Sequence, residues 1–97
     1  MANGKTDASS LCRYRSELGM VVHVGRSESC FSVYPEPGSE PIGTIAMQYR
    51  KYIRVENGGR ITQRWPFKLK DMVYGSKQVI AGIEKIASNY LAKQNRI

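Results

Sequence analysis

The sequence predicts an α+β fold in which a four-stranded antiparallel sheet, made of two hairpins, is followed by one C-terminal amphipathic helix. Residues 20–24 and 30–34 are short β-branched or alternating segments that flank a turn, and residues 45–70 alternate around an Asn-Gly pair. Apolar residues within 79–91 instead recur at three- and four-residue steps, which is typical of a helix. A helix packed on one face of the sheet would bury both apolar surfaces.

The N-terminal segment is polar and precedes the predicted domain. Residues 1–10 are small and polar, so we expect a disordered tail, and we expect residues 11–97 to form a single small domain. Residues 11–18 could begin a strand or a short turn of helix. The first hairpin is then predicted from the strands over 20–24 and 30–34.

A connector over residues 35–41 separates the two predicted hairpins, because its three prolines exclude a central strand. The second hairpin has arms over 45–55 and 60–70, and side chains alternate across each arm. One face is apolar but for Lys51, and Ile61 and Trp65 are predicted to share it. The opposite face is basic, since six of the seven Lys or Arg residues in 50–70 lie on it, and the single acid of this segment is Glu56. The residues predicted to form the binding face are Arg50, Tyr52, Arg54, Arg60, Arg64, Lys68 and Lys70.

The predicted helix begins after Ser76, a good N-cap residue. Ile83, Ile86 and Tyr90 are expected to face the sheet. Gly82 costs about 1 kcal/mol relative to Ala in a helix interior, unless it permits a close approach to the sheet or to another helix. The rest of the stripe could pair with a second copy, or the whole stripe could be buried in a monomer. The residues of this candidate dimer or partner face are Val79, Ile80, Ala87 and Leu91.

The composition argues against catalysis. His23 is the only histidine and lies among valines, and the acids are few and scattered. No nucleophilic triad, paired carboxylates, metal cluster or phosphate loop is evident, so we expect no enzyme, no cofactor and no metal site. Cys12 and Cys30 match neither a disulfide framework nor a zinc pattern. No membrane span or signal peptide is evident, so we expect a cytoplasmic, reducing location and no membrane partner.

The concentration of charge predicts a partner. The net charge is +7, and a basic sheet face that includes Tyr52 suits single-stranded nucleic acid, DNA above all. Tyr52 could stack on a base or pair with a neighbouring Arg. Two alternatives stay open: a solvated basic face, and a small phage-type modulator that docks on a larger DNA- or RNA-processing enzyme. The Trp65–Pro66 bond is a candidate cis peptide or edge-strand bulge, and an exchanging isomer would make it a remote candidate for a prolyl isomerase.

The stretch from Met47 to Ile83 resembles the single-stranded-DNA-binding transcriptional coactivators of the positive-cofactor-four type. Residues 49–54 are similar to that family's third strand, 56–60 to its turn, and 64–69 to its basic-then-apolar fourth strand. The resemblance implies dimerisation through the helices and a grip on single strands by the sheet. By position, that grip would fall to Arg50, Tyr52, Arg54, Arg60, Arg64 and Lys68. Residues 65–67 replace the family's usual Gly-Ile-Ser-Leu-like stretch, and the helix lacks its acidic start and early Trp.

Overall fold

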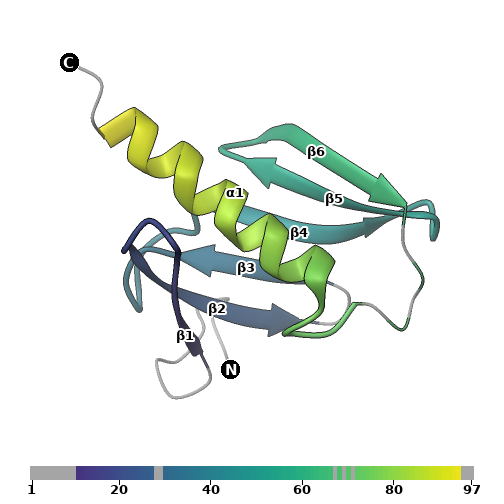
Figure 1. Ribbon diagram of the computed structural model, residues 1–97, viewed down its shortest axis with the longest axis horizontal. Helices are drawn as coiled ribbons and strands as arrows, with labels where there is room; N and C mark the ends of the chain where they lie inside the picture. The colour runs from purple at the N-terminus through teal and green to yellow at the C-terminus, as the bar shows by residue number, and fades with distance from the viewer. Residues whose placement is uncertain (1–10, 28–29, 67, 69, 71, 95–97) are drawn as a thin grey trace.

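A computed structural model describes residues 11–27, 30–66, 68, 70 and 72–94. In this part of the chain, six antiparallel strands lie side by side in sequence order and one helix follows them (Figure 1). The α+β class and the C-terminal helix are confirmed, whereas four strands were too few. The elements are β1 (Cys12–Arg15), β2 (Val21–Ser27), β3 (Cys30–Tyr34), β4 (Gly43–Gln48), β5 (Tyr52–Asn57), β6 (Arg60–Pro66) and α1 (Lys77–Gln94).

The first additional strand is β1, within residues 11–18, for which the sequence predicted either the beginning of a strand or a short turn of helix. It pairs antiparallel with β2 through a turn that Ser16 closes. The Ser16 backbone N–H donates to the Met20 carbonyl over 2.7 Å, and the Ser16 hydroxyl accepts from the Leu18 and Met20 N–H groups. Gly19 supplies the positive φ of 90° that the turn requires.

The second additional strand arises because the single arm predicted over residues 45–55 is wrong. The chain reverses inside it, between β4 and β5. Tyr49 and Arg50 have φ values of 55° and 59°, and the Lys51 N–H donates to the Gln48 carbonyl over 3.1 Å. Two successive positive φ values are those of a type I′ hairpin turn, which normally selects Asn and Gly.

The alternation of residues 45–55 hides this turn. Ile45 pairs with Val55 and Met47 with Ile53 across β4 and β5, so residues on both sides of the turn keep the same parity on the same face. An uninterrupted strand and a hairpin therefore have the same apolar and polar pattern here. Periodicity indicates the face of the sheet on which each residue lies. Tyr49 and Arg50 are not residue types that predict a turn, so the turn has no signal in the sequence.

The second arm also departs from its prediction over residues 60–70, because β6 ends at Pro66. A β-bulge shifts the β5–β6 register between Val55 and Glu56, and the extra residue inverts the faces of the first β6 residues. Ile61 therefore pairs with Glu56 and Arg60 with Asn57. The expected sharing of one face by Ile61 and Trp65 is wrong. A turn is confirmed between the two arms, but its central residues are Gly58 and Gly59, with φ values of 58° and 86°, because Asn57 still pairs with Arg60 in the ladder.

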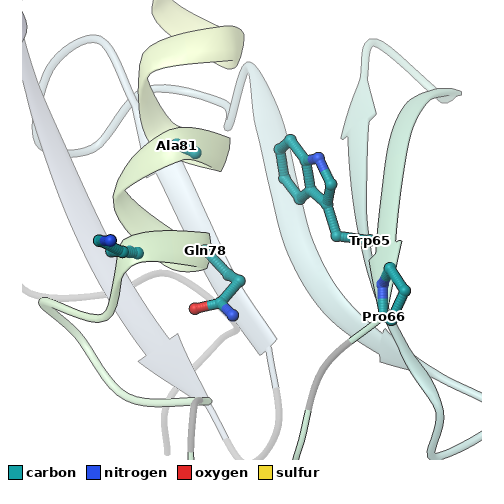
Figure 2. A pocket seen from close by; sticks show the side chains of 5 residues that line it. Trp65, Pro66, Gln78 and Ala81 are labelled. Atoms are coloured by element: carbon teal, nitrogen blue, oxygen red, sulfur yellow. The ribbon is translucent and has the colours of Figure 1, made fainter.

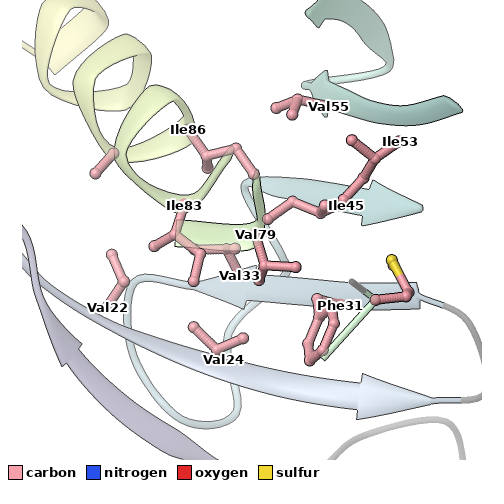
Figure 3. Packing of buried hydrophobic residues seen from close by; sticks show 12 residues of the cluster. Val22, Val24, Phe31, Val33, Ile45, Ile53, Val55, Val79, Ile83 and Ile86 are labelled. Carbon is pink, nitrogen blue, oxygen red and sulfur yellow. The ribbon is translucent and has the colours of Figure 1, made fainter. Parts of the chain in front are cut away.

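The hydrophobic core lies between α1 and one face of the sheet, where the helix packs mainly over β4 and β5 (Figure 3). Val79 and Ala87 are fully buried in it, so the prediction that these two residues belong to a dimer or partner face is wrong. Ile80 is half-buried against the core, and Leu91 is half-buried. The core residues are Val22, Val24, Phe31, Val33, Ile45, Ile53, Val55, Met72, Val79, Ile83, Ile86 and Ala87.

The helix is held at its start and along its flank. The Ser76 hydroxyl accepts a hydrogen bond from the Val79 N–H over 3.2 Å, as its predicted capping role requires. The Tyr14 hydroxyl of β1 donates to the Glu84 carboxylate, which also accepts from the Glu17 N–H over 3.1 Å. This contact ties the β1 edge of the sheet to the middle of α1.

Two further expectations are settled by the backbone. No peptide bond among the described residues is cis, so the Trp65–Pro66 bond, a candidate for the cis form, is trans. No helix in the described ranges is long and apolar enough to cross a membrane. The predicted tail over residues 1–10 lies outside the described residues.

Candidate nucleic-acid interface

The sheet face turned away from α1, here called the open face, has no described element packed on it (Figure 1). Its side chains alternate with those of the core. His23 lies between the buried Val22 and Val24, and Ser32 lies between Phe31 and Val33. The polar half of each strand pattern is therefore gathered on one broad surface.

Cationic and aromatic side chains gather on the part of the open face formed by β4, β5 and β6. Arg54 pairs directly with Arg64 across β5 and β6, and Gln48 pairs with Tyr52 across β4 and β5. The Arg64 guanidinium carbon lies 5.8 Å from the centroid of the Tyr52 ring, within cation–π range. We call Gln48, Tyr52, Arg54 and Arg64 the basic sector.

One acid moderates the charge of the basic sector. Glu56 Oε1 lies 3.8 Å from Arg54 Nη1 and accepts a hydrogen bond from the Thr44 hydroxyl over 3.4 Å. The Arg54 and Glu56 side chains are 32% and 29% exposed. Arg54 Nε and Gln48 Oε1 are covered by protein atoms and have no hydrogen-bond partner in the described structure.

The turn between β4 and β5 extends the basic sector beyond the end of the strands. Tyr49 is 75% exposed, and Arg50 and Lys51 are also exposed beside it. Arg50 was predicted to lie in a strand and instead occupies this turn. An aromatic ring and two cations therefore project from the strand end that also carries Tyr52.

Three residues of the predicted site lie elsewhere. Arg60 lies on the helix side of the sheet, where it lines a groove of about 310 Å³ together with Lys93 at the end of α1. Its predicted place on the basic face is wrong, because the β-bulge inverts its face. Lys68 and Lys70 are exposed and follow β6, so their predicted place in a strand is also wrong.

Sequence reasoning missed two cations on the open face. Arg13 of β1 pairs with His23, and Arg15 pairs with Val21, while Tyr14 between them points to the helix side. The available signal was the Arg-Tyr-Arg alternation itself. At about 4.8 Å per strand, β1 lies roughly 19 Å from β5, so the open face carries cations near both of its edges.

Neither cysteine forms part of a metal site in the described residues, where no group of three His, Cys, Asp or Glu side chains converges. Cys12 is exposed, and Cys30 is half-buried on the open face opposite Ala46. Burial raises the pKa of the Cys30 thiol, while a hydrogen bond with Ser32 and the charge of Arg54 oppose that shift. The described site thus offers charge, stacking and hydrogen bonding.

Comparison with known proteins does not assign the chain to a family. The resemblance to the positive-cofactor-four-type family therefore stays a prediction. No protein-family model matches the chain, and neither a curated protein nor a solved structure matches it.

Proposed function

We propose that this protein binds single-stranded nucleic acid, DNA above all, on the open face of its sheet. The observation that carries the proposal is the placement of Arg64 over the Tyr52 ring, next to Arg54, on a surface that no described element covers. Arginine guanidinium groups bind phosphates, and an aromatic ring stacks on unpaired bases. A duplex hides its base faces, whereas a single strand offers both groups to such a surface.

In the proposed mode, the cations hold the backbone of the strand without reading its sequence. Arg54 and Arg64 contact phosphates on the sheet, and Arg50 contacts one at the turn. A base that stacks on Tyr52 displaces Arg64 from the ring and leaves that guanidinium free for a phosphate. Each stacked base contributes roughly 1–3 kcal/mol, and each neutralised phosphate makes binding more sensitive to salt.

The two arginines of β6 allow a matched test, because Arg60 and Arg64 lie in one strand but on opposite sides of the sheet. Fluorescence anisotropy of a labelled single-stranded oligonucleotide is followed over a salt series for Arg64→Glu and Arg60→Glu. We expect Arg64→Glu to weaken binding about tenfold or more and to reduce the salt slope by about 0.7 per lost phosphate contact. We expect a much smaller effect from Arg60→Glu.

Thermal unfolding of both variants tests whether the fold is retained. Equal losses for the two variants would mean that net charge, not the open face, governs binding. Weak binding that is the same for single strands and duplexes and vanishes near physiological salt would overturn the proposal. That result would favour docking on an acidic protein surface, which the exposed Tyr49 and Ile61 beside the basic sector would also suit.

A further inference from the structure

A groove lies on the helix side of the sheet, between the edge strand β6 and the first turns of α1 (Figure 2). Its volume is about 390 Å³, and it is separate from the open face. Figure 2 shows the Trp65 indole on the strand wall, with Gln78 and Ala81 on the helix wall across from it. The groove is lined by Trp65, Pro66, Lys77, Gln78 and Ala81.

The side chains of this groove offer three kinds of contact. The half-buried Trp65 supplies an aromatic surface, and Gln78 supplies an amide with both donors and an acceptor. Lys77 adds an exposed ammonium group. Within the described residues, none of these three side chains makes a hydrogen bond or an ion pair. The polar groups of Lys77 and Gln78 are therefore not used by the fold, whereas Trp65 also packs against the hydrophobic core.

These contacts define the chemistry of the ligand. An indole favours a flat ring, an amide favours a ring whose edge carries donors and acceptors, and an ammonium favours an attached anion. A nucleobase joined to its phosphate has all three features, and the groove is large enough for it. We infer that the β6–α1 groove binds one nucleobase, stacked on Trp65 and hydrogen-bonded to Gln78, with its phosphate near Lys77.

This inference deepens the proposed function and rests on it for the source of the nucleotide. Arg64 and Trp65 are consecutive in β6, so Arg64 lies in the basic sector on the open face and Trp65 lies on the helix side, at the groove. Strand β6 is the last strand of the sheet, and no described strand pairs with its outer side. A single strand bound to Arg64 can therefore pass round this edge and place its next base against Trp65.

The chain provides its own reporter, because Trp65 is its only tryptophan. Intrinsic fluorescence of the full chain is measured during titration with adenosine monophosphate, uridine monophosphate, adenosine and ribose 5-phosphate. We expect saturable changes with both nucleotides, weaker binding of adenosine, and no comparable response to ribose 5-phosphate. A failure of both nucleotides to alter Trp65 fluorescence, with the fold intact, would overturn the inference.

Surface variants locate the contacts without disturbing the core. Loss of one hydrogen bond by Gln78→Ala is expected to weaken nucleotide binding about three- to tenfold. Lys77→Gln should reduce the affinity for a nucleotide to that for the nucleoside. The control Lys93→Gln removes the same charge at the other end of α1 and should leave the affinity for the nucleotide unchanged. Ala81 is exposed, so Ala81→Glu can fill the groove and repel a phosphate while the fold is kept. Equal affinities for all four variants would contradict the proposed site.

The outcomes for groove and open face are separable. In the Arg54→Glu, Arg64→Glu double variant, oligonucleotide binding should be lost while the response of Trp65 to nucleotides persists. If nucleotides bind but no oligonucleotide does, the groove inference stands and the proposed function fails. If an oligonucleotide binds by anisotropy and neither it nor a nucleotide changes Trp65 fluorescence, the proposed function stands and the groove inference fails.

Discussion

Gly82 of α1 lies directly against Ile45 of β4. A Cβ atom on Gly82 would stand 2.9 Å from Ile45 Cδ1 and 3.1 Å from Val55 Cγ2. The sequence left open whether this glycine served another helix, the sheet or neither. The structure shows that the close approach is to the sheet. Because Gly82 has no side chain, the helix can pack closely on β4 and β5.

Substituting this glycine should therefore destabilise the protein. Gly82→Ala gains about 1 kcal/mol of helix propensity but overpacks the core, which typically costs about 1–3 kcal/mol. We expect a net loss of about 1 kcal/mol in the free energy of unfolding, measured by urea denaturation. Ile45→Val removes the nearest atom, so the double variant should lose less than the sum of the single losses. Exposed Ser88→Ala serves as the control on the same helix, and a stabilising Gly82→Ala would contradict the packing argument.

The turn between β4 and β5 stores backbone strain that can be released. Residues in left-handed backbone conformations cost about 1–3 kcal/mol when they are neither Gly nor Asn, and Tyr49 and Arg50 both adopt one. Replacing them with Asn and Gly, the preferred type I′ pair, should raise the free energy of unfolding by about 1 kcal/mol or more. Thermal unfolding measures this gain.

The same double replacement has an opposite expected effect on binding. It removes an exposed ring and one cation from the end of the basic sector, so oligonucleotide affinity should fall as stability rises. Arg50→Gly alone separates the charge from the ring. An unchanged or lower melting temperature for the Asn-Gly variant would count against the strained turn.

The Tyr14–Glu84 contact predicts a pH dependence of stability. Burial, followed by the hydrogen bond and negative charge of Glu84, raises the pKa of Tyr14 from 10.0 to about 12. The folded state therefore keeps this proton after the unfolded chain has released it. The stabilisation is complete below pH 10, declines as the pH rises from 10 to 12, and is absent above that range.

Tyr14→Phe isolates this contribution from the titration of the other tyrosines and the lysines. The stability difference between the two proteins should be constant below about pH 9 and should shrink above pH 10, as followed by urea unfolding at each pH. Glu84→Gln should also reduce that decline. A difference that does not change with pH would show that Tyr14 gains no protonation-dependent stability from this contact.

The two thiols should react at different rates. Cys12 is exposed, whereas burial raises the pKa of the half-buried Cys30 and so lowers its thiolate fraction. A disulfide-exchange reagent at neutral pH should modify Cys12 rapidly and Cys30 slowly. Cys12→Ser should remove the fast phase, and Cys30→Ser the slow phase. Two equal rates in the folded protein would contradict this order.

Local sequence determined the elements whose signals are carried by neighbouring residues. Ser76 predicted the start of the helix, and Asn57 and Gly58 predicted a turn between β5 and β6. The alternation through β4 and β5 predicted the face of the sheet on which each of their residues lies. The same alternation identified Tyr52 and Arg54 as a pair on one side. These features follow from backbone preferences and side-chain periodicity, which need no knowledge of distant contacts.

Tertiary structure alone decided where the basic residues meet. The Tyr49–Arg50 turn opposes local preference, and the pairing of β4 with β5 holds it in place. The bulge sends Arg60 to the helix side while Arg64 stays on the open face. A one-residue change of register inverts every side chain beyond it, and that register depends on pairing between separate strands. The sequence by itself therefore determined the helix, the first hairpin and the faces of the residues in β4 and β5, whereas only strand pairing decided the number of strands and which cations share a surface.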